Sequence, residues 1–167
     1  MSSIIRGDDG FDTAINGKVL QVVNFQTGAL ATGTTLIPAD DTIPQITEGD
    51  EYMTLAITPT SATSKLKIDV VMAELSTTLS NPQTTVALFV GTTADALAAT
   101  QEYSPDVGTM SSFFFSHTMT SGVTTALTFR VRGGNINANT TTFNGWSSAR
   151  RNGGVSASSI TITEYAG

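Results

Sequence analysis

Cysteine is absent from the 167 residues, and histidine occurs once, as His117. The first absence excludes a disulfide framework, a thiolate metal site and a thiol nucleophile. The second excludes most zinc sites and any centre built from several histidines. Charged residues make up only 13% of the chain, about half the usual share of a soluble domain. The 14 acidic residues outnumber the 8 basic ones, and this balance disfavours a nucleic-acid-binding protein.

Long apolar runs are missing as well. No run approaches the roughly 20 residues that a membrane helix needs, and the N-terminal residues are polar, so we expect neither a membrane span nor a secretory signal. Hydrophobic residues still make up 40% of the chain. Because they alternate with polar residues, they favour a folded chain over a disordered one, and the length suits one domain.

The dominant pattern is a period of two. In Lys65–Met72 every second residue is apolar, and segments 124–132 and 159–165 repeat this alternation, which is typical of half-buried strands. Turn-forming residues separate such segments at the spacing of a sandwich or barrel. We therefore predict an all-β fold, an antiparallel β-sandwich of about eight strands over residues 17–167. Further strands are expected at Lys18–Gln26, Glu51–Thr58, Thr84–Gly91, Met110–Thr120 and Thr140–Gly145.

One segment favours a helix. Residues 93–100 combine Thr93, a suitable N-cap, with several alanines and a leucine. They are long enough for about two helical turns. We predict one short helical loop here, centred on Asp95–Ala99.

Motifs for catalysis and cofactor binding are lacking. The chain has no phosphate loop, nucleotide fingerprint or serine elbow. His117 shares a strand face with Phe113 and Phe115, which favours a packed or interface histidine over a catalytic base. The acidic pairs lack the spacing of a calcium loop, so we interpret them as solvated turns, with a structural calcium as the alternative. We expect no enzymatic activity, no cofactor and no metal. The acidic pairs are Asp8-Asp9, Asp40-Asp41 and Asp50-Glu51.

Two features of the last forty residues leave alternatives open. Trp146, the only tryptophan, suits a core or interface anchor, and a sugar-stacking platform is the alternative. Arg150-Arg151 lies in a loop rich in Gly, Asn and Ser. It suits a solvated loop tip, and docking of an acidic partner is the alternative.

Three apolar residues, Val71, Phe89 and Phe114, point away from the expected core because each is out of phase with the inward-facing residues of its strand. Either both faces of each sheet are covered within one chain, or the second face is a subunit interface, since a monomer rarely exposes several large apolar side chains together. The low charge content favours the second explanation. We predict a homotrimer whose contacts include these three residues.

Three stretches together resemble a family of tailed-bacteriophage virion proteins. They are Gly-Lys-Val-Leu-Gln-Val-Val at 17–23, Ile-Thr-Pro-Thr-Ser-Ala-Thr-Ser-Lys-Leu at 57–66 and Ser-Ile-Thr-Ile-Thr-Glu-Tyr at 159–165. The resemblance extends from Gly17 to Tyr165. It implies a β-sandwich or jelly-roll-like domain, commonly trimeric, of the kind found in tail fibres, head fibres and capsid decoration proteins, and it implies no catalytic residues.

The shortness of the segment before Gly17 favours a capsid decoration or head-fibre protein over a fibre with a shaft. We predict that residues 1–16 form an N-terminal attachment arm that binds the major capsid protein or another virion protein. The protein would then lie on the virion surface after assembly in the host cytoplasm, without nucleic-acid or membrane partners. The alternative is a tail-fibre or receptor-binding tip that recognises host surface glycans. The arm residues expected to contact the partner are Ile4, Ile5, Arg6 and Phe11.

Overall fold

The computed structural model describes residues 17–80, 82–104, 106 and 108–167. The predicted arm, with Ile4, Ile5, Arg6 and Phe11, lies outside these residues. In the described part no helix is long and apolar enough to cross a membrane. The longer strands are β1 (Val19–Thr27), β3 (Asp50–Ile57), β4 (Lys65–Thr77), β5 (Gln83–Val90), β6 (Ala98–Tyr103), β7 (Met110–Thr120), β8 (Leu127–Asn135) and β12 (Ser158–Tyr165). The short elements are β2 (Ala31–Gly33), β9 (Thr141–Phe143), β10 (Gly145–Trp146), β11 (Ala149–Arg150) and the 3₁₀ turn η1 (Asn152–Gly154).

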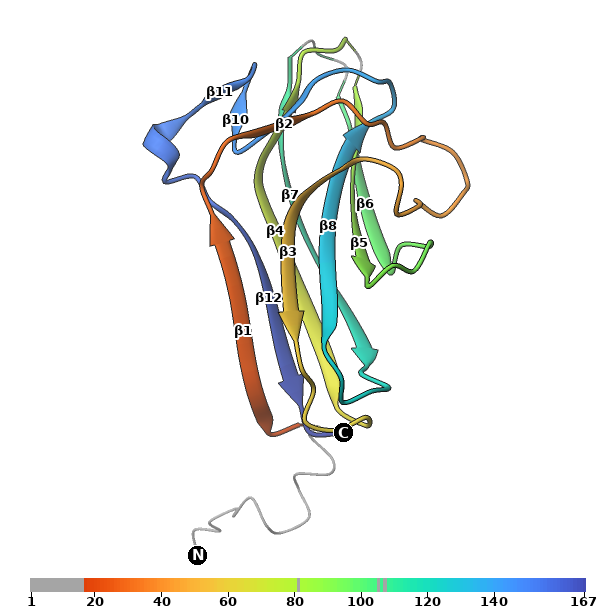
Figure 1. Cartoon of the computed structure of the whole chain (residues 1–167). Helices are drawn as coiled ribbons and strands as arrows, with labels where there is room; N and C mark the ends of the chain where they lie inside the picture. The colour runs from red at the N-terminus through yellow and green to blue at the C-terminus, as the bar shows by residue number, and fades with distance from the viewer. Residues whose placement is uncertain (1–16, 81, 105, 107) are drawn as a thin grey trace, which may run out of the picture.

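The long strands form two antiparallel sheets packed face to face (Figure 1). The first sheet has the order β1-β12-β4-β7, and β9 and then β2 extend it beside the end of β4. The second sheet has the order β3-β8-β5-β6. When the eight long strands are numbered along the chain, the two orders are 1-8-3-6 and 2-7-4-5. This is the topology of a jelly roll, so the predicted fold class is confirmed.

Most strand predictions are confirmed, and β7 has the predicted bounds. The expected strand at Thr140–Gly145 is instead divided into β9 and β10. It is interrupted at Asn144, where the backbone adopts a φ of 53°, a left-handed conformation that Asn tolerates better than most residues.

The predicted helical loop at Asp95–Ala99 is wrong. Residues from Ala98 onward form β6, which pairs with β5 along its whole length. Just before it, the Leu97 amide donates to the Leu88 carbonyl at 2.7 Å, and the Leu97 side chain packs against the core. Helix propensity over so short a segment is weak, and the otherwise unpaired edge of β5 outweighs it. The 3₁₀ turn that the structure does contain lies at Asn152–Gly154.

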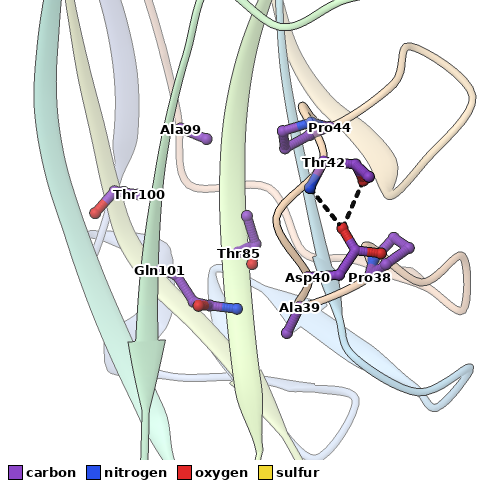
Figure 2. Close-up of a pocket in the computed structure, with 9 residues that line it drawn as sticks. All are labelled: Pro38, Ala39, Asp40, Thr42, Pro44, Thr85, Ala99, Thr100 and Gln101. Carbon is purple, nitrogen blue, oxygen red and sulfur yellow. Dashed lines mark hydrogen bonds between the residues drawn. The ribbon is translucent and has the colours of Figure 1, made fainter.

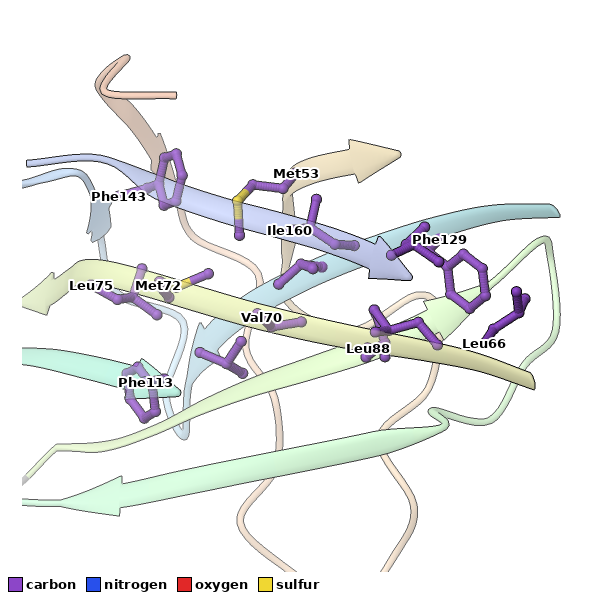
Figure 3. Close-up of a cluster of buried hydrophobic side chains, with 14 of the residues drawn as sticks. Met53, Leu66, Val70, Met72, Leu75, Leu88, Phe113, Phe129, Phe143 and Ile160 are labelled. Carbon is purple, nitrogen blue, oxygen red and sulfur yellow. The ribbon is translucent and has the colours of Figure 1, made fainter. Parts of the chain in front are cut away.

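The core lies between the two sheets (Figure 3). Leu66, Ile68, Val70 and Met72, the predicted inward face of β4, are almost completely buried. Phe129 and Val131 of β8 meet them from the second sheet, and Ile160 and Ile162 extend the layer along β12. Each such side chain contributes about 1.5–3 kcal/mol when it is fully buried.

Candidate interaction surfaces

The outer face of the first sheet carries two of the three predicted interface residues. Val71 of β4 and Phe114 of β7 are directly opposite each other in the antiparallel register. Phe114 is 68% exposed, and Val71 is half-buried. Among the large apolar side chains of the described residues, Phe114 is exceeded in exposure only by Val155.

Phe89, the third predicted interface residue, is completely buried within the single chain, so the expectation that it is available for contact is wrong. It does face away from the core, with Thr85 and Ala87 on the outer face of β5, and both of these are buried too. Residues 34–49, between β2 and β3, cross this side of the sheet, where Ile37 bonds to Asn135 and Pro38 lies beside Thr85. Arg130 of β8 lies opposite Phe89. For the second sheet the alternative explanation holds, namely that one chain covers both faces.

Backbone hydrogen bonds fix this crossing segment, which we call the covering segment (residues 34–49). The Ile37 amide donates to the Asn135 carbonyl at 3.0 Å, and the Ile46 amide donates to the Ala94 carbonyl at 2.7 Å. In the other direction, the Ala96 amide donates to the Pro44 carbonyl at 3.0 Å. The covering segment is therefore tied to β8 and to the loop before β6.

An open groove, which we call the acidic groove, runs between the covering segment and β6 (Figure 2). It consists of two adjoining hollows of about 180 and 420 Å³ that share Asp40, Thr42, Pro44 and Ala99. One oxygen of Asp40 accepts hydrogen bonds from the Thr42 hydroxyl and from the Thr42 amide at 2.9 Å. These bonds, with the hydroxyl contributing most, lower the pKa of Asp40. The groove therefore carries negative charge at neutral pH.

Trp146 lies at the surface in the β10–β11 hairpin and is 37% exposed. Its indole Nε1 donates to the Gly108 carbonyl at 2.9 Å, and the guanidinium carbon of Arg151 lies 5.0 Å from the ring centroid. Trp146 is therefore not a core residue, and the Arg151 guanidinium covers one face of its indole in a cation–π contact.

The remaining sequence candidates are structural. His117 is half-buried on β7 opposite Ile68, as a packed histidine would be. Asp50 accepts bonds from the Thr35 amide and hydroxyl, and Glu51 pairs with Arg130 at 3.0 Å and with Arg132 at 3.5 Å. In the described part of the chain, no three His, Cys, Asp or Glu residues are grouped to hold a metal ion.

Sequence reasoning did not identify the role of Glu164, whose side chain is fully buried on the inner face of β12. One carboxylate oxygen accepts from Gln21 Nε2 at 2.6 Å. The other accepts from the Thr60 amide and hydroxyl, both at 2.7 Å. Burial alone raises the pKa of Glu164, but the hydrogen-bonding groups of Ser64, Gln21 and Thr60 outweigh it and lower the pKa to about 2. Glu164 follows Ile160 and Ile162 at the same spacing of two residues, so the sequence already indicated that its side chain faces the core.

No protein-family model matches this chain, and no curated protein matches it. Among solved structures, dimeric latent PorU from Porphyromonas gingivalis is similar over 90% of this chain and 14% of its own, at 9% identity and a TM-score of 0.39. The VP2 subviral particle of infectious bursal disease virus is similar over 87% of this chain and 38% of its own, at 11% identity and a TM-score of 0.36. Tailspike protein 4 of bacteriophage CBA120 is similar over 85% of this chain and 20% of its own, at 13% identity and a TM-score of 0.27. Likeness at this level carries no argument about function, which rests on the surfaces described above.

Proposed function

We propose that this chain is a non-enzymatic structural protein of a bacteriophage virion. It decorates or cements the capsid as a homotrimer and is attached through its N-terminal arm, residues 1–16. The observation that carries the proposal is that the three stretches resembling phage virion proteins meet in the fold.

Each stretch supplies one member of the Glu164 hydrogen-bond network. Gln21 comes from the first stretch, Thr60 from the second and Glu164 from the third. Gln21 and Glu164 are 143 residues apart in the chain. Strand alternation alone does not require a glutamine, a threonine and a glutamate at these places. The network therefore supports the view that the resemblance reflects a common fold and not only common strand composition.

The proposed self-association rests on the outer face of the first sheet. Val71 and Phe114 remain its contact residues, and Phe89 is withdrawn because it is buried inside the chain. Phe114→Asp is expected to weaken assembly strongly, because it would place an unpaired charge in an apolar contact. Val123→Asp, on the loop after β7, is the control and should leave sedimentation unchanged. A wild-type chain that sediments as a monomer at micromolar concentration contradicts the trimer.

Cryo-electron microscopy or immunogold labelling of the phage particle tests the location. The proposal expects the protein on the capsid shell. Label at the tail tip, together with binding on a glycan array, would favour the receptor-binding alternative instead. Absence from the purified particle would overturn the virion role altogether.

The arm is tested with a variant that begins at Gly17. It should fold and sediment like the full chain but fail to bind particles stripped of this protein, because the apolar residues of the arm would be missing. Three linked arms should bind far more tightly than one through effective concentration. Undiminished binding by the shortened chain would move attachment to the loops of the sandwich.

A further inference from the structure

Charge is distributed unequally between two segments on opposite flanks of the sandwich. Arg132 of β8 donates to the covering segment and Arg130 donates to Gly91, but both arginines are paired with Glu51. Residues 144–156, which contain the β10–β11 hairpin, carry Arg150 and Arg151 but no Asp or Glu. The covering segment and residues 91–104 together carry five carboxylates and no Lys or Arg. Figure 1 shows the hairpin and the covering segment on opposite flanks of the molecule. The five carboxylates are those of Asp40, Asp41, Glu48, Asp95 and Glu102.

The two hairpin arginines have no carboxylate partner among the described residues. Three ion pairs form within the described residues, and neither Arg150 nor Arg151 takes part in them. Arg151 lies on the Trp146 ring. Arg150 lies so close to Gly154 that a Cβ built there would be 3.1 Å from its Nη1.

The hairpin also offers an apolar contact beside its charges. Val155, which follows η1, is 84% exposed, the most exposed of the large apolar side chains in the described residues. A cationic pair next to an exposed valine suits a partner surface that is acidic at its rim and apolar inside.

The acidic groove matches this description, because it combines apolar lining residues with acidic ones. Pro38, Ala39, Pro44, Ala98 and Ala99 line it, and Asp40 and Asp41 lie at its side. Thr42 bonds only one oxygen of Asp40, which leaves the second oxygen available to a partner. Ile43, beside the groove, is 54% exposed.

We propose that the hairpin of one copy of this chain docks into the acidic groove of the next copy. The guanidinium groups of Arg150 and Arg151 then face the carboxylates of Asp40 and Asp41, and Val155 packs against Ile43 and Pro44. The two surfaces differ, so the contact is heterologous, and repeating it builds a closed ring when the rotation between copies closes and an open filament when it does not. Three copies in the ring agree with the homotrimer proposed above. The contact rests on that self-association but not on a location in the virion.

The charge complementarity predicts how assembly responds to salt. Pairs at an interface rim are screened when the Debye length falls from about 10 Å at 0.1 M salt to about 3 Å at 1 M salt. Assembly should therefore weaken as salt rises, whereas an interface formed only by Val71 and Phe114 should not weaken in this way.

Sedimentation velocity of the full chain in 0.1 M salt, with charge-reversed variants, tests the contact. Arg150→Glu/Arg151→Glu and Asp40→Arg/Asp41→Arg should each raise the dissociation constant at least tenfold. The variant that carries all four substitutions has the net charge of the wild type and should recover wild-type assembly. Thermal unfolding of each variant checks that it is folded. If either double variant unfolds, the single pair Arg150→Glu and Asp41→Arg, alone and combined, replaces it.

Three results would overturn the contact. One is wild-type sedimentation of both double variants, and another is failure of the four-fold variant to recover assembly. The third is a wild-type chain that is monomeric, which would also overturn the trimer while leaving the virion location to be decided on particles. If Phe114→Asp dissociates the assembly and the charge reversals do not, the trimer stands without this contact.

Discussion

The two sheets of the sandwich differ in how their outer faces are covered. On the second sheet, Thr85, Ala87 and Phe89 are buried, and the covering segment, residues 34–49, crosses the same side of the sheet. On the first sheet, Phe114 is 68% exposed on the corresponding side. Both faces have the same signature in the sequence, an apolar residue out of phase with the core. Such a residue shows that a surface must be covered, but not whether the same chain or another one covers it.

The covering segment lies on the second sheet because three features favour it. Ile37 is 1% exposed and serves as its apolar anchor. Gly134 of β8 has no side chain, so the backbone of Thr35 and Gly49 approaches it closely. The hydrogen bonds to Asn135 and Ala94 satisfy amides that would otherwise lose water on burial. In the described residues no comparable segment crosses Phe114.

The largest expected effect is the difference in stability loss between replacing Phe89 and replacing Phe114 by alanine. Phe89→Ala should lower the free energy of unfolding by about 3–5 kcal/mol, because it removes a fully buried ring and leaves a cavity. Phe114→Ala should change the unfolding of the isolated chain by less than about 0.5 kcal/mol, because that ring is mostly in water already. Urea denaturation at a concentration where the protein is monomeric measures both values.

Equal losses of stability for the two variants would break the comparison. They would mean that the isolated chain already covers Phe114. A small loss for Phe89→Ala would mean instead that the covering segment is not firmly held on the second sheet.

The second prediction concerns the inner face of the first sheet, where Glu164 connects β1, β12 and the turn at Thr60 from within. Its pKa of about 2 in the folded chain lies below its ordinary value of 4.5. A lowered folded-state pKa stabilises the fold above pH 4.5, and this stabilisation is lost as the pH falls toward 2.

Glu164→Gln should therefore destabilise the chain most at neutral pH. The difference from the wild type should shrink between pH 4.5 and pH 2, since the wild-type side chain becomes neutral there. Chemical denaturation of both proteins across this range measures the effect. A difference that stays constant with pH would show that Glu164 is not a buried, ionised acceptor.

The third prediction loosens the cover of the second sheet without changing an apolar residue. A Cβ at Gly134 would lie 2.7 Å from the Thr35 carbonyl oxygen and 2.9 Å from Ile37. Gly134→Ala should therefore push the covering segment outward and cost about 1–3 kcal/mol of stability. Hydrogen exchange of the Ile37 and Ile46 amides should become faster. Ser116→Ala on β7 is the control, because it changes an exposed strand position and should leave stability unchanged. Gly122→Ala would not serve as the control, because the φ of Gly122 is 71° and alanine would be strained there.

Period-two alternation was enough to predict the antiparallel β-sandwich, the bounds of β7 and the inward face of β4, whereas the jelly-roll expectation came from the resemblance to phage virion proteins. It failed at β6 because Ala98 and Ala99 have no strand preference of their own, and their strand exists only because β5 needs a neighbour. It also failed at Phe89, since residues 34–49 contain no alternation that indicates where they dock. Local pattern predicts local structure, whereas contacts between distant segments depend on the assembled sheet.

The smallest expected effect concerns the β10–β11 hairpin, which is the segment that does reach the first sheet. Asn152, just after it, lies with its Nδ2 3.5 Å from Oε1 of Glu74 on β4. The hairpin turns through Ser147 and Ser148, whose φ angles are 52° and 60°. Positive φ at both central residues is the property of a type I′ turn, in which Asn-Gly is preferred because side chains crowd the backbone.

Ser148→Gly should relieve this strain and raise stability by about 0.5–1 kcal/mol, the gain being reduced by the greater freedom that glycine gives the unfolded chain. The melting temperature should rise by about 1–4 °C for a domain of this size. Ser116→Gly is the matched control, because it makes the same substitution in the extended backbone of β7, where glycine should destabilise the chain. A rise for both variants would exclude turn strain as the cause. A rise for Ser148→Gly alone would show that the hairpin is held in a strained conformation, a condition that persists only where surrounding contacts enforce it. Those contacts are the bond from Trp146 to Gly108 and the bond from the Ser148 amide to the Thr142 hydroxyl at 3.0 Å.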